Sequence, residues 1–257
     1  MTSAVIVLGE GERHAFNLES PKGCVWHLDS DAGIDFKSWD DEERGGRRFS
    51  VVSRVTGRHD LKARCSEKTP ELPDGALDLT VYVCQKGGNI YASAVEGFPL
   101  RLRLDEEGDG PWAVVEDGGT ECRIVGDGNE AGLLLRSGAP GDRRIALSSS
   151  EGLRMLKLRV SPVGTRARLA GKVGEPVEYR IRSNITTGFE WDVVDDGGLR
   201  CESAYVSDPN PRLLDGVGGS QVFRITAGSP GTFILRALYT RSDEVGGSLE
   251  IIFEADP

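Results

Sequence analysis

Short runs in which apolar and polar residues alternate recur along the whole chain. Clear cases are Val177-Glu178-Tyr179-Arg180-Ile181 and Leu100-Arg101-Leu102-Arg103-Leu104. This period of two is typical of half-buried β-strands, and clusters of turn-forming residues separate the runs. No stretch gives a convincing amphipathic helix, and residues 197–210 predict only a short irregular turn. The pattern therefore predicts an all-β protein, which agrees with a count of 34 glycines in 257 residues.

The strand-like runs recur in three units of similar length. Three of the four tryptophans, Trp26, Trp112 and Trp191, each follow a strand-like run and a polar turn. They are 86 and 79 residues apart (112 − 26 and 191 − 112). Upstream of each tryptophan lies another strand candidate, at residues 4–8, 90–95 and 166–173. This recurrence indicates tandem copies of one β unit.

Glycine and proline mark the boundaries between the units, at Lys86-Gly87-Gly88 and Ser161-Pro162-Val163-Gly164. We therefore predict domains at residues 1–86, 87–162 and 163–257, each a small β-sandwich of roughly six to eight strands. The middle unit is expected to lack a closing strand like residues 77–83, or to borrow one, because only four residues separate Val160 from the next unit.

Composition and charge describe a globular protein with an acidic surface. Hydrophobic residues make up 38% of the chain and charged residues 28%, with a net charge of −10. Nucleic acids and anionic membranes require a basic face, so neither is expected as a partner. The N-terminus lacks a basic leader, and no apolar stretch approaches a membrane span. We therefore expect a cytoplasmic chain whose five cysteines are reduced and mostly buried.

Residue types that carry most enzyme chemistry form no pattern in this chain. The histidines are His14, His27 and His59, and no Cys-x-x-Cys, His-Glu-x-x-His or phosphate-loop motif is present. Cys24 and His27 are three residues apart, which on a strand places their side chains on opposite faces. The glycine–aspartate turns at 108–110 and 126–128 lack the ligand spacing of a calcium loop. We expect a non-enzymatic protein with no cofactor and no metal.

The most distinctive stretch is Ser183-Asn184-Ile185-Thr186-Thr187-Gly188-Phe189-Glu190-Trp191, which lies between two strand-like runs. Its Asn, Thr and Gly residues are turn formers, and Trp191 is expected to anchor the next strand. The stretch resembles the Asn-Pro-Thr-Thr-Gly-aromatic-x-Trp signature of the chagasin family of cysteine-protease inhibitors, with Ile185 replacing the proline. Gly216-Val217-Gly218-Gly219 resembles the family's Gly-x-Gly-Gly loop. Arg241 fits the arginine of its Arg-Pro-Trp loop, which here continues Ser242-Asp243-Glu244.

The resemblance implies an immunoglobulin-like sandwich for the last third of the chain. The repeats extend this expectation to three tandem immunoglobulin-like β-sandwich units. The resemblance also implies that three loops wedge into the cleft of papain-like cysteine proteases without covalent chemistry. The implied protease-binding residues are Asn184, Ile185, Thr186, Thr187, Gly188, Phe189, Gly216, Val217, Gly218, Gly219 and Arg241. The corresponding first loops of the two upstream units, at residues 20–25 and 105–111, carry no such motif.

Two other classes of function stay open from the sequence. The chain could be a non-inhibitory structural or adaptor protein whose partners are neighbouring subunits of a large assembly, because three fused sandwiches offer much surface and several edge strands. Carbohydrate binding is a third class, but only 7% of residues are aromatic and they form no obvious platform.

Overall fold

A computed structural model describes residues 2–18, 26–29, 33–41, 46–65, 76–104, 111–126, 131–209, 218–242 and 244–257. Within these ranges the regular structure is β-strand, apart from one 3-10 turn, η2 (Ile185–Thr187). The prediction of an all-β protein is therefore confirmed. A search of the same ranges for a helix long and apolar enough to cross a membrane finds none.

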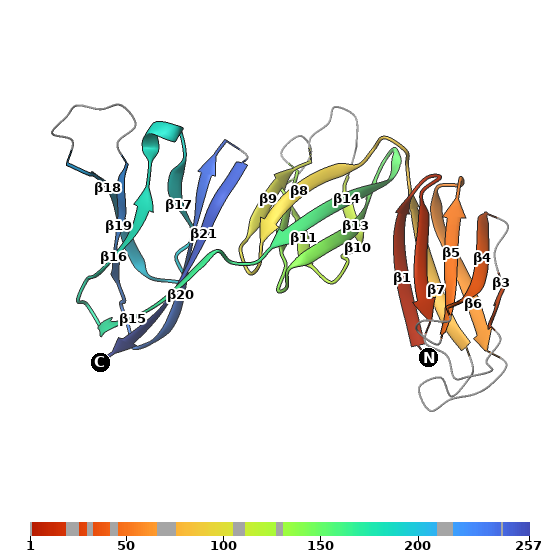
Figure 1. Ribbon diagram of the computed structural model, residues 1–257, viewed down its shortest axis with the longest axis horizontal. Helices are drawn as coiled ribbons and strands as arrows, with labels where there is room; N and C mark the ends of the chain where they lie inside the picture. The colour runs from red at the N-terminus through yellow and green to blue at the C-terminus, as the bar shows by residue number, and fades with distance from the viewer. Residues whose placement is uncertain are drawn as a thin grey trace. The chain divides into compact units, whose positions relative to one another are not determined.

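Within the described ranges the strands fall into three sets of seven in chain order, and their labels can be followed in Figure 1. The first set is β1 (Thr2–Gly9), β2 (Arg13–Leu18), β3 (Trp26–Asp29), β4 (Ile34–Asp41), β5 (Gly46–Ser53), β6 (Gly57–Cys65) and β7 (Ala76–Cys84). The middle set is β8 (Ile90–Val95), β9 (Leu100–Arg103), β10 (Ala113–Glu116), β11 (Glu121–Val125), β12 (Gly132–Arg136), β13 (Gly141–Ser149) and β14 (Gly152–Ser161). The third set is β15 (Thr165–Lys172), β16 (Val177–Ser183), β17 (Glu190–Asp195), β18 (Arg200–Ser207), β19 (Gly219–Thr226), β20 (Gly231–Arg241) and β21 (Glu244–Asp256).

Each set consists of a four-stranded and a three-stranded sheet with the same strand order. In the first set the orders are β1-β7-β6-β3 and β2-β5-β4. They recur as β8-β14-β13-β10 with β9-β12-β11, and as β15-β21-β20-β17 with β16-β19-β18. The first strand runs parallel to the last in the pairs β1–β7 and β15–β21, whereas β6–β7 and β20–β21 are antiparallel hairpins. Seven strands divided between two sheets in this order are typical of an immunoglobulin-like sandwich, and three tandem units of this kind stay a prediction.

Two local expectations from the sequence are corrected by the strand order. The place that β7 and β21 occupy in their sheets is taken in the middle set by β14, so a closing strand is present there. Residues 197–210 contain β18 rather than an irregular turn alone. β18 lies at a sheet edge and most of its residues are exposed, so its sequence lacks the alternation that marks the other strands.

The turn between the first two strands of each set, which we call the first turn, makes the same three backbone hydrogen bonds. In the first set the N–H groups of residues 10, 11 and 12 donate to the carbonyls of Cys84, Ser53 and Gly9 at 2.8, 2.6 and 2.9 Å. In the middle set residues 96, 97 and 98 donate to Ser161, Ser137 and Val95 at 2.9, 2.7 and 3.0 Å. In the third set residues 173, 174 and 175 donate to Asp256, Ala227 and Lys172 at 2.9, 2.9 and 3.1 Å. The sets therefore agree in detail as well as in strand order.

By compactness the chain divides into two units. Unit 1 comprises residues 1–92, 101–135 and 142–159, and unit 2 comprises residues 93–100, 136–141 and 160–257. Segments of the middle set thus belong to both units. The domain boundaries at 86/87 and 162/163 stay a prediction, with which the repeated strand order agrees.

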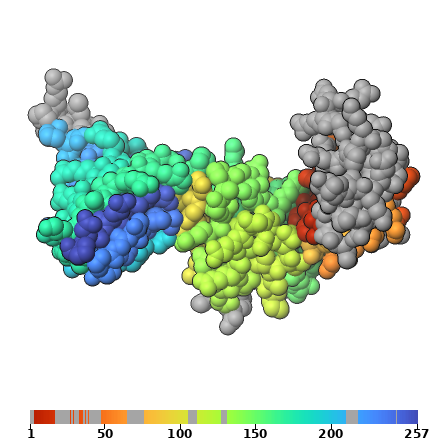
Figure 2. Space-filling model, turned by 90° about the horizontal axis from the view of Figure 1, so that it is seen from below, coloured from red at the N-terminus to blue at the C-terminus, as the bar shows by residue number. Residues whose placement is uncertain are grey.

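The core of the third set is built from both of its sheets. Phe223 and Ile225 on β19 join Leu235 on β20 and Phe253 on β21 in one cluster, and all four are fully buried. Trp191, the second residue of β17, belongs to the same cluster with 8% of its surface exposed. The expectation that it anchors the strand after the turn is therefore confirmed. In the space-filling view the strand β21 forms the dark blue part of the surface (Figure 2).

The turn between β17 and β18 packs tightly against β20. It is closed by the Leu199 N–H, which donates to the Asp196 carbonyl at 3.1 Å, and Gly197 and Gly198 have φ of 63° and 86°. Two successive positive φ angles are typical of a type I′ turn, which here joins one sheet to the other. A Cβ on Gly197 would lie 2.2 Å from the Ile234 carbonyl oxygen, whereas one on Gly198 would meet nothing within 4 Å.

We therefore expect Gly197→Ala to lower the free energy of unfolding by about 2–4 kcal/mol, because a backbone clash adds to the strain of a positive φ. Gly198→Ala is the matched control, which has the positive φ without the clash and should cost about 1 kcal/mol. Urea unfolding of both variants measures the difference. Equal costs would show that the contact with β20 does not constrain this turn.

Candidate functional site

Three connections lie at one end of the third set, which we call the loop end. Residues 184–189, which we call the wedge, join β16 to β17 (Figure 1). Ser183 pairs with Gly219, so the start of β19 lies beside the start of the wedge. Glu190 pairs with Thr240, so the β20–β21 hairpin lies beside the end of the wedge. The sheet register therefore brings together the parts of the chain that the sequence analysis selected.

Hydrogen bonds within the wedge hold it in a compact turn. The Asn184 side-chain oxygen accepts from the Thr186 N–H at 3.2 Å and from the Thr186 hydroxyl at 2.7 Å. The Thr187 hydroxyl donates to the Asn184 carbonyl at 2.6 Å. The Gly188 N–H donates to the Ile185 carbonyl at 3.0 Å, with a φ of 79° that favours glycine. Each polar side chain of the Asn-x-Thr-Thr-Gly motif is used inside the turn, while the Ile185 side chain is 42% exposed.

Tyr239 on β20 fastens the wedge to the sheet beneath it. Its hydroxyl accepts from the Asn184 N–H at 3.0 Å and donates to the Asn184 carbonyl at 3.2 Å. Its ring stacks on Phe189 and on Trp191, with both ring centroids 5.1 Å away. The Trp191 indole N–H donates to the Arg182 carbonyl at 3.2 Å, which holds the strand that leads into the wedge. Tyr239 was not among the predicted site residues, because its role follows from the register that pairs it with Trp191, and local sequence patterns do not give that register.

Arg241, the last residue of β20, joins the hairpin to the wedge. Its guanidinium carbon lies 4.6 Å from the centroid of the Phe189 ring, a cation–π contact. One terminal nitrogen donates to the Thr187 carbonyl at 3.4 Å, and the other is 2.6 Å from a Glu244 carboxylate oxygen. Glu244, which was not among the predicted site residues, thus neutralises Arg241 across the hairpin.

The predicted glycine loop is only partly within the described residues. Gly216 and Val217 lie outside them. Gly218 accepts a hydrogen bond from the Asp208 N–H at 3.0 Å, and Gly219 begins β19. A Cβ on Gly219 would lie 2.4 Å from the Val206 carbonyl oxygen, so this position has no space for a side chain.

Comparison with known proteins places this end of the chain in a family. Residues 171–254, which contain all three connections, match the model of the chagasin family peptidase inhibitor I42. The chain is 34% identical over 91 residues to chagasin from Trypanosoma cruzi, covering 32% of this chain and 80% of the relative. The chain belongs to the chagasin family.

Two of the solved structures that are similar to the chain cover about a third of it. Amebosin has 25% sequence identity and a TM-score of 0.28, with coverage of 35% of this chain and 88% of amebosin. A cysteine protease inhibitor from Entamoeba histolytica has 16% identity and a TM-score of 0.31, with coverage of 36% and 88%. The resemblance to the chagasin family that the sequence analysis stated is confirmed by the family match and the curated relative.

The chagasin family consists of peptidase inhibitors, which agrees with the expectation of a non-enzymatic protein. Three thiols of the described chain are poor nucleophiles. Burial raises the pKa of Cys84 to about 12 and those of Cys122 and Cys201 to about 11, so all three stay protonated near neutral pH. Cys24 lies outside the described residues. The described part of the chain contains no group of three His, Cys, Asp or Glu residues that could hold a metal ion.

The position of Tyr239 generates a prediction about the rigidity of the wedge. Tyr239→Phe keeps both ring stacks and removes the two hydrogen bonds to Asn184, so it should lower the free energy of unfolding by about 1 kcal/mol. Amide exchange at residues 184–189 should accelerate at least about fivefold, because the tie between wedge and sheet is lost. Tyr179→Phe is the control, since its hydroxyl makes no hydrogen bond to the described residues. Unchanged exchange in Tyr239→Phe would mean that the internal bonds of the wedge alone hold it.

Proposed function

We propose that the chain inhibits papain-like cysteine proteases by placing the wedge in their substrate cleft. The observation that carries this proposal is the preorganisation of the wedge. Its turn is closed by its own side chains and fastened to the sheet by Tyr239 and Arg241. A loop already ordered before binding loses little conformational entropy when it enters a cleft. The family match over residues 171–254 supports the proposal independently of this geometry.

The shape of the wedge also explains why it would block a protease without being cleaved. Proteases bind substrates as extended segments, whereas residues 185–187 form a 3-10 turn followed by a left-handed glycine. Unfolding the turn for cleavage would break the hydrogen bonds of Asn184 with Thr186, Thr187 and Tyr239. Inhibition would then be reversible and competitive, with no covalent step.

The hairpin beside the wedge gives the proposed contact a polar flank. Arg241 pairs with Glu244, and both side chains are about half exposed, 50% and 58%. The Arg-Pro-Trp loop of the family would place an aromatic side chain here, and aromatic anchors often dominate interface energy. We propose that most of the contact energy in this chain comes from the wedge and the adjoining residues 216–219, with Arg241 acting mainly on the wedge itself.

Ile185 provides the sharpest test of the wedge, because its side chain is exposed and has no role in holding the turn. Ile185→Asp would place a carboxylate in an apolar protease cleft, so we expect it to raise the inhibition constant for papain by at least about 100-fold. Val194→Asp is the matched control, since Val194 is a 37% exposed valine on β17 outside the wedge. Inhibition is measured as the loss of cleavage of a fluorogenic peptide.

Equal inhibition by the Ile185→Asp variant and the wild type would contradict the assignment of the wedge. Equal weakening by both aspartate variants would indicate a general effect of charge or folding. Thermal unfolding of each variant separates that outcome from a loss of contact.

Ile185→Pro tests whether a stiffer backbone in the wedge improves its inhibition of the protease. Ile185 is the first residue of η2, a position that suits proline, and Asn184 has φ −139° and ψ 89°, outside the helical region that a following proline disfavours. We therefore expect the variant to gain about 0.4–1 kcal/mol in stability and to inhibit papain at least as tightly as the wild type. Weaker inhibition by a stably folded Ile185→Pro chain would mean that the wedge must adapt its shape on binding.

A further inference from the structure

One position on the outer face of the four-stranded sheet has a different chemistry in each set. The position is the fifth after the glycine that begins the strand. It is Lys62 in β6, Ala146 in β13 and Arg236 in β20. Lys62 pairs with Asp78 and Arg236 with Glu250 across the hairpin, and Ala146 shares a buried cluster with Met155 of β14. Strand neighbours of these residues lie in the cores, so the position itself faces outward.

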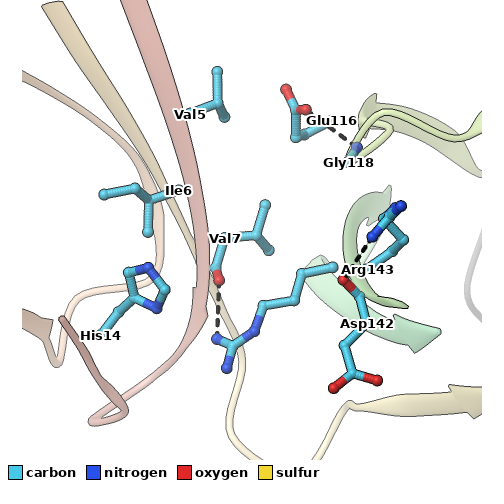
Figure 3. Close-up of a pocket in the computed structure, with 9 residues that line it drawn as sticks. Val5, Ile6, Val7, His14, Glu116, Gly118, Asp142 and Arg143 are labelled. Carbon is cyan, nitrogen blue, oxygen red and sulfur yellow. Dashed lines mark hydrogen bonds between the residues drawn. The ribbon is translucent and has the colours of Figure 1, made fainter. Parts of the chain in front are cut away.

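In unit 1 this position of the middle set is covered by residues of the first set. Val7, Tyr82 and Cys84 join Ala146 and Met155 in one buried apolar cluster. Glu12 of the first turn lies 2.7 Å from an Arg144 nitrogen, and Arg144 also donates to the Val7 carbonyl at 3.1 Å. An open cavity of about 330 Å³ lies beside this contact and is lined by Val5, Val7, His14, Glu116 and Arg143 among others (Figure 3).

In unit 2 the same position of the third set is covered by the first turn of the middle set. The Phe98 ring lies 5.8 Å from the Arg236 guanidinium carbon and is 1% exposed. Glu96 lies 3.2 Å from Arg166 on β15, and Arg136 lies 3.0 Å from Asp195 on β17. In both units a first turn therefore contacts the outer face of the following four-stranded sheet, and in unit 1 residues of β1 and β7 supply the apolar part of the contact.

Arg236 is part of a row of alternating charges that crosses the whole sheet. Arg166, Glu250, Arg236 and Asp195 are direct cross-strand neighbours on β15, β21, β20 and β17. Their successive ion pairs measure 3.3, 3.1 and 3.0 Å. Glu96 of the first turn and Arg136 at the end of β12 extend the alternation at its two ends, so two segments of the middle set complete the row.

The first set carries the same order of charges over three strands, but exposed. Asp78, Lys62 and Asp29 are cross-strand neighbours on β7, β6 and β3, and they repeat the signs of Glu250, Arg236 and Asp195. Their side chains are 42%, 44% and 65% exposed. By contrast, the side chains of Arg236 and Glu250 are each only 13% exposed.

The third set provides a first turn with the same backbone hydrogen bonds and an acidic residue that can oppose Lys62. Residues 173–175 make the same hydrogen bonds as the two covering turns, and Glu175 is exposed at the place of Glu12 and Phe98. We propose that the first turn of the third set in one copy of this chain docks on the row Asp78–Lys62–Asp29 of a second copy. In this contact Glu175 of one copy faces Lys62 of the other, just as Phe98 faces Arg236 within one chain. The result is head-to-tail self-association.

The physical character of this contact follows from its residues. Glu175 opposes a lysine, so the contact is an exposed ion pair that salt weakens. It lacks the tether that holds neighbouring sets of one chain at an effective concentration of about 1 mM, so association should need high protein concentrations. Residues 173–175 lie at the end of β16 opposite the wedge, so a docked chain keeps its wedge accessible. Because such a contact is heterologous, it would build open chains rather than closed dimers.

A charge-swap experiment with the 257-residue chain tests the proposal. Sedimentation equilibrium of the wild type should show an average mass that rises above that of the monomer as the concentration approaches about 1 mM at low salt. Lys62→Glu places Glu175 against a glutamate, and Glu175→Lys places a lysine against Lys62, so each variant alone should stay monomeric. In an equimolar mixture both possible contacts again join opposite charges, so association should return to the wild-type level.

Arg180→Glu is the control, because it makes the same charge change as Lys62→Glu at an exposed site on the other sheet of the third set. It should associate as the wild type does. A wild type that stays monomeric throughout the range would overturn the proposal. So would single variants that associate normally, or a mixture that fails to restore association when thermal unfolding shows both variants folded.

Discussion

The hydroxyl of Tyr239, held between the N–H and the carbonyl of Asn184, is the contact on which the loop end depends. The ring behind it lies between Phe189 and Trp191, so one side chain of β20 contacts both ends of the wedge and the buried anchor. Trp191 in turn belongs to the core between the two sheets. A surface turn thereby shares the rigidity of the sandwich, and Arg241 adds a cation–π contact at its outer edge.

Local sequence patterns predicted most of the strands and turns of this arrangement. They predicted very few of the contacts between individual residues. Alternation and turn residues were sufficient for the all-β fold, for the strands on either side of the wedge and for Trp191 as an anchor. Tyr239 and Glu244 were missed because their roles depend on the register of β20 with β17 and β21, which includes a shift after Tyr239. Alternation states which face a residue occupies but not which residue stands opposite. β18 was missed because an exposed edge strand needs no apolar face.

The three sets show how one sandwich can keep its backbone and change its surfaces. The first turns agree in three hydrogen bonds each, although their sequences differ. On the outer sheet face the middle set has Ala146 and Met155, which bury apolar surface, while the third set has Arg236 and Glu250 in a charged row. A partly buried charged row contributes little net stability, because the cost of removing its charges from water offsets their attraction. Only the third set carries the Asn-x-Thr-Thr-Gly motif, so its loop end combines this shared frame with the family's loop signature.

The central claim is that the wedge covers the catalytic thiol of a papain-like protease, and protection of that thiol tests it most directly. Active papain would be treated with iodoacetamide in the presence of increasing amounts of the 257-residue chain. The account predicts that the rate of alkylation of the catalytic cysteine falls in proportion to the chain added and approaches zero at one equivalent. An alkylation rate that stays unchanged while the chain is bound to the protease would contradict the account, because the chain would then occupy a surface away from the cleft.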